Sequence, residues 1–166
     1  LAARNALSLV LQASVIVDHR AVDRWTRYAH LHAQRTADPR LEAVVDIGHA
    51  RAMVRRADPR SAKALLERAL SRLREGEHAS ERMEATELLA RIEFSLDHND
   101  TARSLLERHL TLAEAHYGPE HPKLRGTLQT LIELDTIQGV SEQTDVRLQR
   151  LRSITQQAYG EHDPRQ

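Results

Sequence analysis

The chain has 166 residues, of which 40% are hydrophobic and 29% are charged, and this balance excludes an intrinsically disordered or a membrane-embedded protein. Lys and Arg total 24, and Asp and Glu also total 24, so the basic excess typical of nucleic-acid-binding proteins is absent. There is no cysteine, which excludes disulfides and thiolate metal sites and is compatible with the cytoplasmic location that we expect.

The first predicted element is a helix over about 2–17, nearly uncharged from Asn5 to Val17. Its apolar stretch is too short and too polar to span a bilayer, so we expect no membrane contact. Because such an apolar surface needs a cover, we expect upstream sequence or a second copy of the chain to pack against it. The chain begins with Leu, and we regard it as a fragment of a longer protein.

Three further helices are predicted at about 20–36, 39–56 and 59–75. Asp38-Pro39 and Asp58-Pro59 mark two of the starts, because the carboxylate caps the first turn and proline fits the first helical position. Ala, Leu, Glu, Arg and Gln dominate the composition while strand-favouring residues are scarce, so the sequence predicts an all-α protein.

The second half of the chain predicts helices at about 80–97, 100–117, 122–139 and 142–158. Gly118 and Gly139 stand where two helices must end, and glycine adopts the positive φ required there at little cost. His121 is expected to order the turn before Pro122, and Ser141 is expected to cap the last helix. All turns are short, so neighbouring helices are expected to run antiparallel.

Two motifs recur at nearly the same interval. LLERAL at 65–70 returns as LLERHL at 105–110, a spacing of 40, and YGPEHP at 117–122 returns as YGEHDP at 159–164, a spacing of 42. Such periodicity is typical of stacked helical repeats, in which neighbouring repeats share one core. We therefore expect an α-solenoid of about four antiparallel helix pairs forming a single domain over 1–166, with repeats at 1–36, 39–75, 80–117 and 122–158.

The apolar positions resemble those of tetratricopeptide repeats. The pairs Leu89-Ala90 and Leu131-Ile132 match the first helix of that pattern, and the sets Ala62/Leu66/Ala69 and Ala102/Leu106 match the second. The repeat length and the YGPEHP junction look like the long-repeat variety of kinesin light chains and of bacterial multidomain proteins. This resemblance implies attachment to a linked domain, such as that of a bacterial serine/threonine kinase or another multidomain regulator.

Three residues depart from the family pattern. His109 stands where a small residue is expected, Asp135 replaces an aromatic one, and Thr144 replaces an alanine. The asparagines and lysines with which some family members grip peptides are not evident. The resemblance therefore implies a protein or peptide partner without naming it.

The titratable residues do not form a recognisable catalytic or metal site. Among ten histidines, His30 and His32 are two residues apart and so lie on different helix faces, and there is no HExxH motif. Acidic pairs such as Glu81/Glu84 stand near helix ends, where they favour the helix dipole. We expect no enzyme activity, no metal and no cofactor.

In the family that the sequence resembles, first helices line the concave face where ligands bind. The positions that this implies for partner binding are Val45, His49, Glu87, Arg91, Phe94, Gln129, Glu133 and Thr136. Phe94 lies off the main apolar stripe, so it either packs between repeats or anchors a partner.

The function that follows is a scaffold that binds a protein or peptide in a concave groove and positions or regulates a linked domain. One alternative is a ligand- or peptide-sensing domain of a bacterial transcriptional regulator, which a closed apolar pocket would favour, whereas an open charged groove would favour peptide or protein binding. The other is an enzyme with its site in the groove, which requires converging titratable groups.

Overall fold

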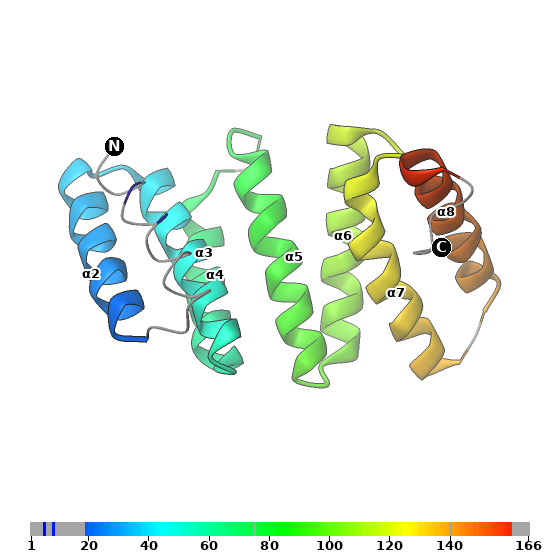
Figure 1. Cartoon of the computed structure of the whole chain (residues 1–166), viewed down its shortest axis with the longest axis horizontal. Helices are drawn as coiled ribbons and strands as arrows, with labels where there is room; N and C mark the ends of the chain where they lie inside the picture. The colour runs from blue at the N-terminus through cyan, green and yellow to red at the C-terminus, as the bar shows by residue number, and fades with distance from the viewer. Residues whose placement is uncertain (1–4, 6–7, 9–18, 75, 140, 161–166) are drawn as a thin grey trace. The chain divides into compact units, whose positions relative to one another are not determined.

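The protein is all-α. The structure, a computed structural model, describes residues 19–74, 76–139 and 141–160 together with Asn5 and Ser8. From residue 19 to residue 160 these form seven α-helices and a short 3-10 helix without any strand (Figure 1). The helix expected over 2–17, with its surface for self-association, lies outside the described residues. No helix among the described residues is long and apolar enough to cross a membrane.

Two compact units make up the chain, Leu1–Asp97 and His98–Gln166. In the first, four helices lie side by side in alternating directions (Figure 1). They are α2 (His19–Thr36), α3 (Pro39–Arg55), α4 (Pro59–Arg72) and α5 (Ala79–Ser95). These bounds match the predicted helices closely. The grouping of helices into four repeats of one domain stays a prediction.

Both Asp-Pro starts are confirmed. The Asp38 carboxylate accepts hydrogen bonds from the backbone N–H groups of Arg40 at 3.0 Å and Leu41 at 3.2 Å. The Asp58 carboxylate accepts one from the N–H of Ser61 at 3.1 Å. Each cap satisfies amides that have no partner within the helix, which fixes where α3 and α4 begin.

Three turns after helices use non-glycine residues with positive φ. Ala37, Ala57 and Asp97 have φ values of 48°, 56° and 61°. Each follows a helix end and turns the chain into the next helix after only one or two further residues. The left-handed region costs an L-residue roughly 1 kcal/mol or more, and no glycine in the sequence signals these three turns.

Alanine dominates the core of the first unit. Ala29 and Ala33 of α2 form a fully buried cluster with Val45 of α3, and Trp25 and Leu41 cover it. Small side chains let helix axes approach closely, which is why so few aromatic residues suffice. Further alanines with no exposed surface occur in α3, α4 and α5, and they are Ala43, Ala50, Ala62, Ala69, Ala85 and Ala90.

The second unit contains α6 (Asn99–Tyr117), a 3-10 turn η1 (Pro122–Leu124), α7 (Arg125–Gln138) and α8 (Glu142–Tyr159). Its core is built mainly from leucine, with α7 contributing most of it. The fully buried large side chains are Leu106, Leu124, Leu128, Leu131, Leu134 and Ile154. The helix expected from residue 122 begins with the 3-10 turn η1 and becomes α-helical at Arg125.

The YGPEHP junction between α6 and η1 is an ordered turn. Gly118 has a φ of 93°, which a residue with a side chain rarely adopts. The Tyr117 and His121 rings stack 5.0 Å apart, and His121 Nδ1 accepts a hydrogen bond from the Lys123 N–H at 3.2 Å. Arg150 of α8 donates to the Pro119 carbonyl. The predicted role of His121 in ordering this turn is thus confirmed.

The departures from the family pattern have structural explanations. Asp135 is 4% exposed, and it forms ion pairs of 2.6 Å with both Arg103 of α6 and Arg147 of α8. Thr144 is buried because its hydroxyl accepts from the Ser141 N–H, completing a capping box that confirms Ser141 as the cap of α8. His109 is also buried, in the place of the expected small residue.

Candidate functional site

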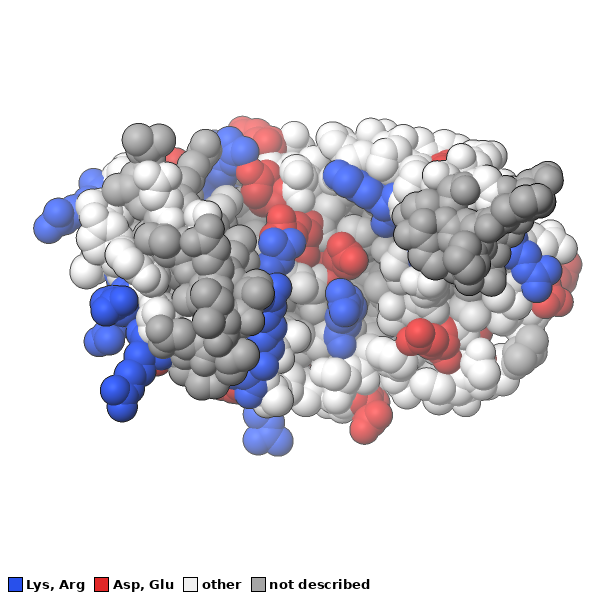
Figure 2. Space-filling model, in the orientation of Figure 1, with Lys and Arg blue, Asp and Glu red and all other residues white. Residues whose placement is uncertain are grey.

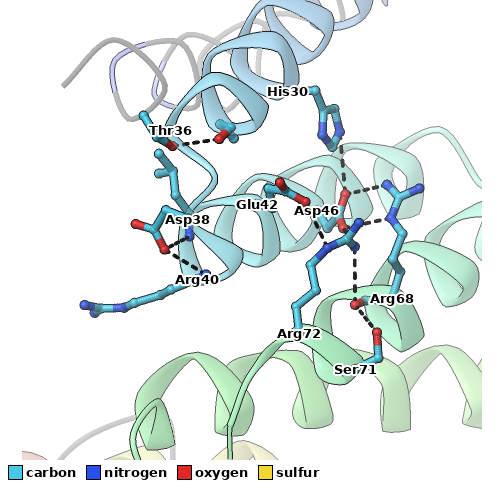
Figure 3. A network of polar contacts seen from close by, with 11 residues as sticks. His30, Thr36, Asp38, Arg40, Glu42, Asp46, Arg68, Ser71 and Arg72 are labelled. Carbon is cyan, nitrogen blue, oxygen red and sulfur yellow. Dashed lines mark hydrogen bonds and ion pairs between the residues drawn. The ribbon is translucent and has the colours of Figure 1, made fainter.

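A network of polar side chains joins α2, α3 and α4 (Figure 3). At its centre the Asp46 carboxylate, 1% exposed, accepts from Arg68 Nε at 2.8 Å and from Arg72 at 2.9 Å. Glu42 pairs with the Nε of the same Arg72 at 3.0 Å. His30 Nε2 lies 3.6 Å from the Asp46 carboxylate.

The electrostatics of this network favour a structural role. Burial is the largest cause that lowers the pKa of His30, and the charges of Arg68 and Arg72 add to it, while Asp46 and Glu42 oppose it. Because two guanidinium groups already occupy the Asp46 oxygens, that carboxylate has no free edge for a substrate or a metal. Among the described residues, no group of three or more His, Cys, Asp or Glu side chains could hold a metal ion.

The candidate site is a groove of about 710 Å³ within the first unit. It is formed by the second half of α3, the turn that leads into α4, and the second half of α5, since α3 and α5 are neighbours. The floor is apolar and the rim carries three arginines. The lining residues are Arg51, Val54, Arg55, Ala57, Pro59, Leu88, Arg91, Ile92 and Ser95.

Helical spacing explains how the two walls arise. Arg51, Val54 and Arg55 are separated by three and four residues on α3, and Leu88, Arg91, Ile92 and Ser95 repeat that spacing on α5. Residues three and four apart share one helix face, so each helix presents a single mixed face to the groove. Ile92 is buried below, whereas Val54 is 43% exposed. The groove is therefore open to solvent and is not a closed pocket.

The three arginines of the groove differ in whether an acidic residue neutralises them. Arg51 is paired with Glu84 at 2.9 Å, and burial raises the pKa of that glutamate. Arg55 and Arg91 are exposed and have no acidic partner among the described residues. On the face drawn in Figure 2, Lys and Arg side chains gather near α5, with Asp and Glu side chains towards its beginning. The rim therefore offers two unpaired positive charges above an apolar floor.

Only one of the residues predicted for partner binding lines this groove, namely Arg91. Glu87 lies one turn before it on α5 and is half-buried, and Phe94 is half-buried on the same helix. Val45 is 1% exposed in the alanine core, so it has no surface to offer a partner. His49 is half-buried, and its ring lies 6.0 Å from that of His30.

Helix geometry explains where these four residues lie relative to the groove. At about 100° per residue, Val45 and His49 lie about 240° and 200° around α3 from Arg51, and so they point towards the core. Glu87 and Phe94 lie within about 60° of Arg91 and remain on its side of α5. Applying the repeat spacing of 40 to Arg91 leads directly to Arg51, and applying it to Phe94 leads to Val54. That signal was present in the sequence and would have found two of the missed groove residues.

The remaining predicted residues belong to the second unit. Gln129, Glu133 and Thr136 are all exposed on α7. Glu133 stands 42 residues after Arg91, so it holds the corresponding place in its repeat with the opposite charge. The Thr136 hydroxyl donates to the Ile132 carbonyl at 2.8 Å, which leaves it less available to a partner.

No known protein family matches the chain, and no curated protein does. Among solved structures it is similar to a point variant of a Podosopora anserina protein named for kinesin light chain and for its nearly identical TPR-like repeats. The TM-score is 0.81 at 16% identity, covering 97% of this chain and 78% of that one. A second structure of such a protein gives 0.47 at 15% identity, covering 95% and 97%.

The fold is that of tetratricopeptide-like repeats. The first of these likenesses carries this assignment, and it agrees with the motifs of the sequence. Repeat folds of this kind stack helix pairs and commonly present extended surfaces to other proteins. The α-solenoid class predicted from the sequence is thereby confirmed.

Proposed function

We propose that this protein is an interaction scaffold whose α3–α5 groove holds an extended segment of a partner protein. The observation that carries the proposal is the pairing of an apolar floor with two unpaired arginines, Arg55 and Arg91, on the rim. Apolar pockets supply affinity in peptide grooves, and a few charged groups fix orientation and register.

The charge of the rim selects the chemistry of the segment. Arginine binds carboxylates in a two-pronged geometry, so a large apolar side chain flanked by Asp or Glu would satisfy floor and rim together. The nearby Glu87 disfavours additional acidic residues towards the beginning of α5. We therefore propose a segment with one apolar anchor and acidic residues on the side that faces Arg55 and Arg91.

A peptide-display selection against the full chain tests this proposal. We expect enriched peptides to carry Asp or Glu next to Leu, Ile, Phe or Trp. The double variant R55E/R91E should weaken the best peptide by roughly tenfold or more, because it reverses both rim charges. Leu88→Ser should also weaken binding of that peptide, because it replaces an apolar side chain that lines the groove with a polar one.

The matched control is R108E/R152E, which reverses two exposed arginines of α6 and α8. It should leave groove binding within about twofold, since neither residue lines the groove. Enrichment of basic peptides, or equal losses in both double variants, would refute the proposal. Circular dichroism of every variant verifies that the helices are intact.

The rival function, a sensor for a small ligand, calls for an enclosed apolar pocket. Here Arg51 and Val54 are 41% and 43% exposed at the edge of the groove, which favours a chain segment over a small molecule. We also propose that the scaffold serves a linked regulatory domain, such as a bacterial serine/threonine kinase, as the family resemblance implies. The cytoplasmic location of the protein also remains a prediction.

A further inference from the structure

The exposed face of α2 carries a row of arginines that the groove does not use. Arg20, Arg24, Arg27 and Arg35 are all exposed, and their spacing places them on one face of the helix together with Leu31. We call these five residues the arginine stripe. At 1.5 Å per residue the stripe extends over about 22 Å.

The guanidinium groups of the stripe have no acidic partner among the described residues. The acid of α2, Asp23, is held by Arg56 of α3 at 2.8 Å. The Arg27 Nε donates to the Asp23 carbonyl of its own helix at 3.3 Å, and the Arg24 guanidinium lies over the Trp25 ring, 5.4 Å from its centre. These contacts hold two of the side chains along the helix while leaving their outer edges free for a carboxylate.

Several other arginines of the same unit do have acidic partners. Arg40 pairs with Glu81, and both Arg68 and Arg72 pair with Asp46. Like charges three or four residues apart destabilise a helix by a few tenths of a kcal/mol each, so the stripe weakens α2. An uncompensated row of this kind is better explained by a partner than by folding.

The segment that precedes α2 in the sequence has no net charge with which to compensate the stripe. Residues 1–18 contain one acidic residue, Asp18, and one basic residue, Arg4, so that segment has no net negative charge to offer four arginines. Over the whole chain the formal charge is zero, which makes the stripe a local excess.

Apolar surface within the stripe narrows the class of partner. Leu31 is 59% exposed, between Arg27 and Arg35, and Tyr28 beside it is 43% exposed. A phosphate backbone would leave Leu31 uncovered, and a single leucine in line with the arginines does not form the separate apolar face that a membrane-surface helix needs. A protein segment with carboxylates on both sides of an apolar residue would satisfy the whole row.

We propose that the arginine stripe is a second docking surface, distinct from the groove, for an acidic helical segment of a partner protein. Carboxylates of that segment would each meet one guanidinium, and its apolar residue would pack on Leu31 and Tyr28. The complement of the stripe has Glu at the spacings of the four arginines and Leu opposite Leu31.

The experiment uses the full chain and a labelled peptide with that pattern of Glu and Leu, followed by fluorescence anisotropy. We expect R24E/R27E to weaken binding by about tenfold or more, and R24K/R27K to weaken it less, because lysine keeps the charge but loses the two-pronged geometry. L31A should weaken binding without changing its salt dependence. The control R108E/R152E, which reverses two exposed arginines outside both surfaces, should stay within about twofold of the original chain.

Equal losses in R24E/R27E and R108E/R152E would show unspecific attraction and overturn the proposal. So would stripe-dependent binding that is tighter to a single-stranded oligonucleotide or to phosphatidylserine vesicles than to the peptide. If R24K/R27K binds the peptide as well as the original chain does, and L31A leaves the affinity unchanged, the surface recognises charge alone. The assignment to a protein segment then fails. Thermal unfolding of R24E/R27E confirms that α2 remains folded.

Discussion

Lys63 of α4 lies 2.7 Å from Glu93 of α5, whose side chain is 3% exposed. A corresponding ion pair occurs in the second unit. Arg103 stands 40 residues after Lys63, Asp135 stands 42 residues after Glu93, and the two side chains lie 2.6 Å apart. At the corresponding place on α2, 40 residues before Lys63, the acid Asp23 pairs with Arg56. Asp23, Lys63 and Arg103, which are spaced by 40 residues, therefore each form an ion pair with the following helix. The residue at this position is acidic in the first case and basic in the other two.

This reversal predicts that the polarity of the Lys63–Glu93 pair can be exchanged. K63E and E93K should each lower the melting temperature, because each places two like charges in contact, one of them buried. The double variant K63E/E93K should recover most of the loss. A double-mutant cycle from thermal unfolding gives the coupling, and a double variant less stable than both single variants would contradict the prediction.

The buried Asp135 carboxylate should contribute strongly to the second unit. Burial raises the pKa of Asp135, but hydrogen bonds from Arg147 and Arg103 outweigh it, so the pKa lies below the ordinary 3.8. The stability that this shift supplies is present above pH 3.8 and is lost as the pH falls through the lower folded-state value. We expect D135N to cost about 3 kcal/mol at neutral pH and to flatten the stability loss below pH 3.8.

Urea unfolding of D135N between neutral and acidic pH measures both effects. D145N on α8 is the matched control, since Asp145 is an exposed aspartate. A loss in D135N no larger than in D145N would show that the two arginine contacts add nothing to stability.

His30 and His49 should make the first unit sensitive to mild acid. Burial is the main cause that lowers the pKa of each below 6.5. For His30, Arg68 and Arg72 add to the effect of burial, while Asp46 and Glu42 oppose it. For His49, the neighbouring His30 and Arg56 add to the effect of burial, while Asp46 and Asp23 oppose it. For a histidine whose folded-state pKa is lowered, the unfolded chain binds more protons just below pH 6.5, so stability falls as the pH drops through that value.

The double variant H30Q/H49Q should therefore lose less stability than the original chain between pH 7 and pH 5, roughly the range over which histidine titrates. His116 lies exposed on α6 and serves as the control as H116Q. Melting temperatures across this range provide the comparison. Identical pH profiles in all three proteins would show that the two half-buried histidines do not titrate with folding.

The left-handed alanine at the end of α2 predicts a stabilising substitution. Ala37 has a φ of 48°, and replacing it with glycine removes the steric cost of that conformation. We expect A37G to raise the free energy of unfolding by about 0.5 kcal/mol after the greater flexibility of the unfolded chain is deducted. The control A64G, at an exposed position inside α4, should lower it by about 1 kcal/mol. Thermal or urea unfolding decides the sign.

Much of the fold was predictable because local chemistry specified it. The Asp-Pro caps, Gly118 and the recurring LLER motif each act over a few residues, and together they placed the helices from residue 20 onwards. The left-handed turns at Ala37 and Ala57 were missed, because tertiary packing imposes them on residues that do not favour them.

The candidate site was predicted less well, because it depends on the angular position of residues around each helix. Arg91 lines the candidate groove, whereas Val45 and His49, named from the same family pattern, lie on the side of α3 that faces the core. A family pattern indicates which helices line a face but not which side of each helix is turned outward. The buried carboxylates Asp46 and Glu93 gave no signal at all, since a charge is expected on the surface until its partner is known.

One position of the repeat is occupied by Arg51 on α3, by Arg91 on α5 and by Glu133 on α7. The side chain at this position is thus basic in two helices and acidic in the third. None of the three side chains belongs to the buried core. Such a position can vary at little cost to the packed core, although Arg51 does lose its ion pair with Glu84 when it is replaced. Binding preference in this chain could thus diverge one helix at a time, and a designer could alter it by exchanging single outward residues while keeping every alanine contact beneath them.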